Sequence, residues 1–124
     1  MLLPQGAVPV YAASGNVANA AAAAALAADA NRWNYLTGFD VTGAGATAAS
    51  IVAVTVSGLY GGITKTYKIG VPAGATTQIT PLRVTFDPPL KSAAKNTAIT
   101  VSAAAFGTGN LHASTNVQGY AHSE

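Results

Sequence analysis

The chain has 124 residues, enough for about one domain with a modest hydrophobic core. Only 8% of the residues are charged, against a usual figure of roughly 25%, and the formal net charge is +2. The six basic residues are scattered, which argues against a nucleic-acid-binding surface, and four carboxylates leave few acid–base groups for an enzyme.

The chain contains no cysteine, which excludes disulfides and cysteine metal sites. Its first residues lack the basic region and the long apolar stretch of a signal peptide. The longest weakly apolar run, residues 20–28, is too short to span a bilayer. We therefore expect no membrane span and a protein that folds in a reducing cytoplasm.

A monomer with so few charges has a weakly hydrated surface. We interpret the low charge as a sign that other subunits cover much of the surface. The alternative is an ordinary soluble domain with a coat of Ser, Thr and Asn side chains.

Residues 1–13 are predicted to form an extended N-terminal arm, because Pro4 and Pro9 disfavour helix and remove backbone donors. An apolar segment with two prolines cannot easily fold on itself, so we expect it to dock on the body or on a neighbour. A frayed terminus is the alternative. The arm residues predicted to lie in a protein interface are Leu2, Leu3, Pro4, Val8, Val10 and Tyr11.

Residues 17–28 are ambiguous between strand and helix. Alanine has the best helix propensity of all residues, but this alanine-rich segment lacks the spacing of an amphipathic helix. A strand of small residues suits a place where two packed layers leave little room. We favour a strand, with a short helix as the alternative.

The rest of the chain alternates apolar and polar residues at the period of a β-strand, between turns rich in Gly and Pro. Strands are predicted near residues 32–42, 50–57, 64–71, 77–86, 97–106 and 115–121. In the first of these, the alternation places Trp33, Tyr35, Thr37, Phe39 and Val41 on one face. Pro88 and Pro89 are expected to end the strand that begins near residue 77.

Two of these strands, 50–57 and 64–71, are joined by a link too short for a parallel crossover, so they should form an antiparallel hairpin. Tyr60 stands in that link and is a further predicted interface residue. Six to eight strands without helical partners predict an all-β protein, an antiparallel and jelly-roll-like β-sandwich over residues 14–124.

Few residues in the chain are candidates for catalysis or for metal binding. Asp40 and Asp87 are the one carboxylate pair near strand ends, and a solvated surface role is the simpler interpretation. His112 and His122 lack a matched carboxylate or cysteine for a metal site. We therefore predict no catalytic residue, no cofactor and no metal. The candidates for exposed aromatic residues, which could anchor a protein interface or stack on sugar rings, are Tyr11, Trp33, Tyr60 and Tyr120. For Trp33, packing in the core is the favoured alternative.

Five segments of the chain, taken together, carry a resemblance to known proteins. They are residues 14–19 (SGNVAN), 35–47 (YLTGFDVTGAGAT), 71–75 (VPAGA), 86–90 (FDPPL) and 96–99 (NTAI). In these turn and strand signatures the chain resembles small structural proteins of tailed-phage virions, and among them most of all the capsid decoration (cement) proteins.

The resemblance implies a jelly-roll-like domain that binds the major capsid protein on the outside of the shell. It also implies a dimer or trimer that bridges neighbouring capsid subunits, made and assembled in the cytoplasm of a bacterial host. The alternative function is a carbohydrate- or receptor-binding module of a phage head or tail fibre.

Overall fold

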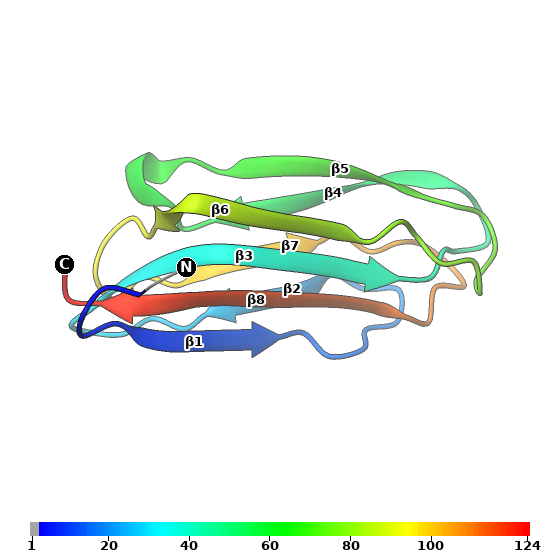
Figure 1. The fold of residues 1–124 in the computed structure, drawn as a ribbon. Helices are drawn as coiled ribbons and strands as arrows, with labels where there is room; N and C mark the ends of the chain where they lie inside the picture. The colour runs from blue at the N-terminus through cyan, green and yellow to red at the C-terminus, as the bar shows by residue number, and fades with distance from the viewer. Residues whose placement is uncertain (1–2) are drawn as a thin grey trace.

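The computed structural model describes residues 3–124, and these form two four-stranded β-sheets packed face to face (Figure 1). The elements are β1 (Val8–Ala13), β2 (Ala22–Leu26), β3 (Trp33–Gly43), β4 (Ser50–Ser57), the 3₁₀ turn η1 (Tyr60–Gly62), β5 (Lys65–Val71), β6 (Leu82–Lys91), β7 (Ile99–Ala103) and β8 (Ala113–His122). All strand pairs are antiparallel. The predicted all-β antiparallel sandwich is therefore confirmed.

The strand pairs are nested around one central hairpin. β4 pairs with β5, as predicted, then β3 pairs with β6, β2 with β7, and β1 with β8. Sheet A has the strand order β1-β8-β3-β6, and sheet B has the order β2-β7-β4-β5. Sheet A lies in front of sheet B in Figure 1, with both chain ends at the left-hand end of the sandwich.

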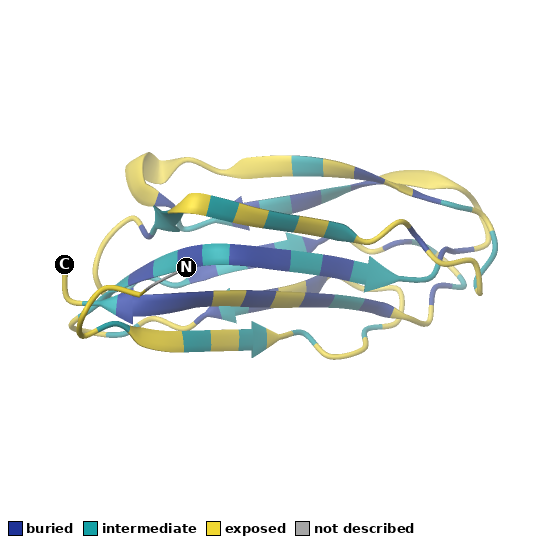
Figure 2. Ribbon diagram, viewed as in Figure 1, coloured by how far each residue is buried: buried dark blue, intermediate teal, exposed yellow. Residues whose placement is uncertain are grey.

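The core lies between the sheets and is built from alternate strand residues (Figure 2). Val52, Val54 and Val56 of β4 are buried, and they face Leu36 and Val41 of sheet A within one apolar cluster. Such alternation is what a strand needs in order to bury one face and expose the other.

The alanine-rich segment forms a strand, not a helix. Ala22, Ala24 and Leu26 of β2 are buried, while Ala23 is exposed. β2 pairs with β7 along its full length, so tertiary packing outweighs the helix propensity of alanine here.

The prediction that one face of β3 carries Trp33, Tyr35, Phe39 and Val41 together was wrong, because the strand contains a β-bulge. The pairing of β3 with both neighbours shifts register between Leu36 and Gly38. A bulge adds one residue to one strand, so the side chains before it exchange faces with those after it. Phe39 is buried as expected, but Trp33 and Tyr35 are only half-buried and lie on the outer side of sheet A.

The bounds predicted for the strand after residue 77 were also wrong. β6 begins at Leu82 and continues through Pro88 and Pro89 to Lys91. β6 is an edge strand of sheet A, and its residues 86–89 have no cross-strand partner on β3, so both prolines lie where no ladder hydrogen bond is needed.

The second half of the N-terminal segment is a strand of the sandwich. β1 pairs with β8 from Val8 to Ala13 and forms the other edge of sheet A. Before it, the Ala7 N–H donates to the Pro4 carbonyl at 3.0 Å, which makes a tight turn. The segment therefore docks on the chain's own body, one of the two partners expected.

Candidate interaction surface

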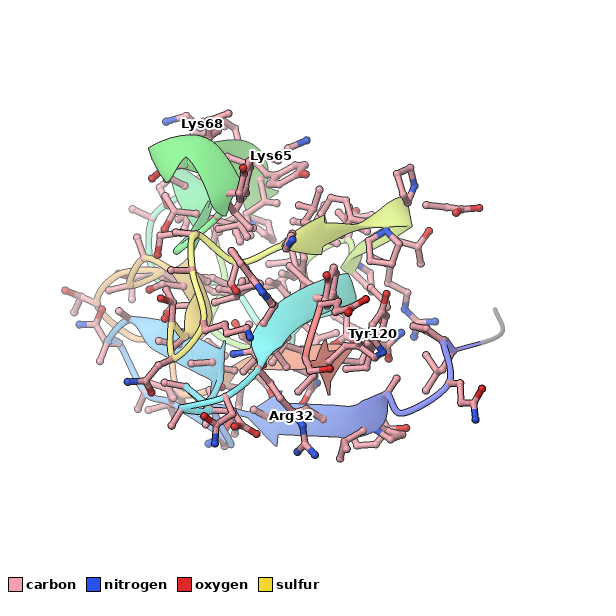
Figure 3. All side chains as sticks on the ribbon, turned by 90° about the vertical axis from the view of Figure 1, so that its left-hand side faces the viewer. Arg32, Lys65, Lys68 and Tyr120 are labelled. Carbon is pink, nitrogen blue, oxygen red and sulfur yellow. The ribbon has the colours of Figure 1, made fainter. Side chains whose placement is uncertain are left out.

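Four aromatic rings and one lysine gather at the end of the sandwich that holds both chain ends. We call this group the end cluster: Trp33, Tyr35, Tyr60, Lys91 and Tyr120. Its members come from β3, η1, β6 and β8. Figure 3 faces this end of the molecule, and Tyr120 lies there on the sheet A side.

Strand register brings most of these residues together. Tyr35 of β3 is opposite Tyr120 of β8 on one side and opposite Lys91 of β6 on the other. Residues directly opposite in an antiparallel pair have neighbouring side chains on the same face. The β3 bulge sets which residues of that strand take part, because it turns Tyr35 outward.

The Lys91 ammonium lies over the rings of the end cluster. Its Nζ is 3.9 Å from the centre of the Trp33 ring, 5.8 Å from that of Tyr60 and 6.0 Å from that of Tyr35. A cation at such distances is attracted by the negative faces of the rings, by roughly 0.5–1 kcal/mol at an exposed site. Lys91 therefore adds a weak attraction that favours this arrangement of the aromatic side chains.

Tyr35 and Tyr120 form a stacked pair at the base of the cluster. Their ring centres are 4.8 Å apart and their planes differ by 12°. Burial, and then the nearby Glu124 carboxylate, raise the pKa of Tyr35 above its usual value. Burial, and then Tyr35, raise the pKa of Tyr120. Both phenols therefore stay neutral at neutral pH and act as hydrogen-bonding, flat apolar surfaces.

A shallow hollow of about 170 Å³ opens beside the end cluster. Tyr60 and Ile63 stand at its rim with 62% and 58% of their surface exposed. Its other lining residues include Leu59, Lys65, Pro89 and Lys91. Large exposed apolar side chains around a hollow are typical of a protein-binding site.

The predicted interface residues of the N-terminal segment lie in different environments. Leu3, Pro4, Val8 and Tyr11 are exposed, with Tyr11 reaching 76% on the outer side of β1. Val10 packs instead against the core. Leu2 lies outside the described residues.

Tyr60, the remaining predicted interface residue, belongs to the end cluster. The structure adds residues that the sequence analysis did not single out, namely Tyr35, Ile63 and Lys91. Ile63 follows directly on the glycines of η1 and could have been noticed as an apolar residue in a turn. Tyr35 and Lys91 could not, because only the cross-strand register brings them together.

The residues considered as catalytic acids or metal ligands lie apart from one another. The Asp40 carboxylate accepts a hydrogen bond from Asn116 Nδ2 at 2.9 Å. His112 lies beside Asn16, whereas a ring nitrogen of His122 is 2.9 Å from the Gln5 carbonyl oxygen. Within residues 3–124, no three His, Cys, Asp or Glu side chains gather as a metal site would need. In the same residues, no helix is long and apolar enough to cross a membrane.

Comparison with protein-family models, with curated proteins and with solved structures finds no match for this chain. The interpretation of the surface therefore depends on its own geometry.

Proposed function

We propose that this chain is a structural protein of a tailed-phage virion that decorates the outside of the capsid. In this role a dimer or trimer of the chain binds the major capsid protein and bridges neighbouring capsid subunits. The observation that carries the proposal is the exposure of Tyr60 and Ile63 around the hollow beside the end cluster. Large aromatic and apolar side chains of this kind are the usual anchors of protein interfaces.

The form of the hollow fits an anchoring role. Lys91 restrains the Trp33 and Tyr60 rings before any partner arrives, so little side-chain freedom is lost on binding. The space of about 170 Å³ suits an apolar side chain of the partner. Lys65 and Lys91 at its border favour a capsid segment that also carries an acidic residue.

The fold supports the same class of function. Four nested antiparallel pairs in two sheets form a β-sandwich, and this arrangement supports the jelly-roll-like fold that stays a prediction from the sequence. Jelly rolls are common in viral capsid proteins and in lectins. This support is an analogy at the level of the fold, because one fold can host many functions.

The low charge of the chain is consistent with extensive contact between copies. Ten charged side chains in 124 residues leave broad surfaces that can be covered without removing charges from water. Desolvating unpaired charges opposes association, so a charge-poor surface lowers that cost.

The proposal is tested by adding the purified chain back to capsids that lack it. The capsids come from the phage that encodes the chain, and binding is measured by cosedimentation at increasing protein concentration. We expect saturation at a fixed number of copies per capsid subunit and a rise in the temperature at which the particles break. Tyr60→Ala should weaken binding by about tenfold or more, the effect of losing an interface anchor.

Leu111→Ser is the matched control. Leu111 is also a large exposed apolar residue, at 59%, but it precedes β8 at the opposite end of the sandwich (Figure 1). We expect it to bind as the unchanged chain does. Equal binding by Tyr60→Ala and the unchanged chain would remove the end cluster from the interface, and no binding by either would overturn the proposed function.

A further inference from the structure

A second surface feature lies on the outer face of sheet A, away from the hollow at Tyr60. Two depressions of about 280 and 270 Å³ adjoin there, and both are lined by Gln118 of β8. One extends to Arg83 on β6, and the other to Tyr11 on β1. We call them together the sheet A groove. It runs across all four strands, about 14 Å at the usual strand spacing.

Polar and apolar side chains both line the groove. The apolar ones include Pro9 and Val84, and the polar ones are Thr37, Asp40, Arg83, Thr85 and Gln118. These groups offer both donors and acceptors: the guanidinium only donates, the carboxylate only accepts, and the hydroxyls and the carboxamide do both.

Several of these polar groups have unused hydrogen-bonding capacity. Arg83 is paired in register with Asp40, yet the one ion pair in residues 3–124 joins Arg32 to Asp29. The Gln118 carboxamide forms no hydrogen bond with another described side chain or backbone group. Gln118 and Arg83 are both exposed, so a ligand from solution can reach their polar groups.

The charges and rings of the groove restrict the chemistry of that ligand. One Asp and one Arg leave the groove with no net charge, so neither an anion nor a cation is favoured. At one end the flat ring of Tyr11 is 76% exposed, and it offers an apolar face to the C–H groups of a bound molecule. A molecule with many hydroxyls, no charge and an apolar ring face meets all of these conditions.

We propose that the sheet A groove is a binding site for a neutral oligosaccharide. Sugar hydroxyls bridge Gln118, Arg83 and Asp40, and one ring lies against Tyr11. This site goes beyond capsid binding, because it is separate from Tyr60 and would let a capsid-bound copy hold a glycan on its exposed face.

The test titrates the full chain with neutral hexasaccharides built from glucose, mannose or galactose, and with an acidic oligogalacturonate. Binding is measured by calorimetry and by chemical-shift changes of the backbone amides. We expect saturable binding of at least one neutral sugar, with the largest shifts in β8 and β6, and weaker binding of the acidic sugar. Gln118→Ala and Arg83→Ala should each lower the affinity by about tenfold, through lost hydrogen bonds.

Gln78→Ala and Lys68→Ala are the matched controls, since both side chains are exposed and lie outside the groove; Lys68 is labelled on β5 in Figure 3. They should bind as the unchanged chain does, and thermal melts check that every variant folds. No saturable binding tighter than about 1 mM by any neutral sugar would overturn the proposal. So would preference for the acidic sugar, or capsid binding lost in Gln118→Ala, which would make the groove a protein interface.

Discussion

At the scale of single residues, the buried asparagine of β3 holds two loops to the sandwich. The Asn34 side chain is 1% exposed, and its Nδ2 lies 2.9 Å from the carbonyl oxygens of both Ala27 and Thr97. These carbonyls follow β2 and precede β7, at a point where no strand partner is available. A buried polar group that loses its partner costs roughly 1–3 kcal/mol.

Asn34→Ala should therefore lower the free energy of unfolding by about 1–3 kcal/mol, because the partly buried carbonyls of Ala27 and Thr97 lose their donor. Urea denaturation measures the change. Asn31→Ala, at an exposed position nearby, is the control and should have little effect. A loss for Asn34→Ala as small as that for Asn31→Ala would show that water replaces the amide without cost.

The stacked tyrosines make the free energy of unfolding depend on pH in the alkaline range. Burial raises the pKa of Tyr35 in the folded chain, so the unfolded chain releases that proton first as the pH rises. The folded state then binds more protons than the unfolded state, and stability falls with rising pH from about pH 10. Below this range, both states hold the proton and the effect is absent.

We expect the free energy of unfolding to decline as the pH rises above about 10 and Tyr35→Phe to reduce that decline. Denaturation at several pH values, with tyrosinate absorbance recorded in parallel, provides the measurement. Tyr11→Phe, in an exposed position, is the control. An identical slope for the unchanged chain and Tyr35→Phe would contradict the assigned cause.

At the scale of elements, the N-terminal segment has two parts that can be deleted separately: the turn before β1, and β1 itself. Deleting residues 1–7 removes the turn before β1 but keeps every β1–β8 pair. Deleting residues 1–13 removes the strand, uncovers the edge of β8 and loses the packing of Val10 and Ala12 on the core. An uncovered β-edge invites association with other chains.

The shorter deletion should melt close to the unchanged chain, whereas the longer one should melt well below it and aggregate. Thermal melts and gel filtration distinguish these outcomes. On capsids, the shorter deletion should bind more weakly if Leu3 and Pro4 belong to the interface. Unchanged capsid binding would remove Leu3 and Pro4 from the interface.

Alternation in the sequence predicted most of the strands, because a half-buried strand needs apolar residues at every second position. It predicted the β4–β5 hairpin and favoured a strand for the alanine segment. It missed the bulge at Thr37, since a bulge is a property of two paired strands and not of one sequence. That error placed Trp33 and Tyr35, two of the five residues of the end cluster, on the wrong face of their strand.

At the scale of the whole molecule, the two proposed surfaces occupy different places. The hollow beside Tyr60 lies at the end of the sandwich, and the sheet A groove crosses its broad face. A copy attached through its end could keep that face open to the surroundings. The sequence named Tyr60 and Tyr11 as exposed aromatics, but the combination of Arg83 with Gln118 appears only when β6, β3 and β8 are aligned.

The nested pairing also has a consequence for how the chain is made. Synthesis produces β1 before the other strands of the sandwich, yet its partner β8 comes after all of them in the sequence. The central β4–β5 hairpin can close early, since its strands are near in sequence, while the β1–β8 pair of sheet A forms only after β8 has left the ribosome. We expect an apolar, unpaired leading strand throughout translation, which makes the nascent polypeptide a natural client for a chaperone.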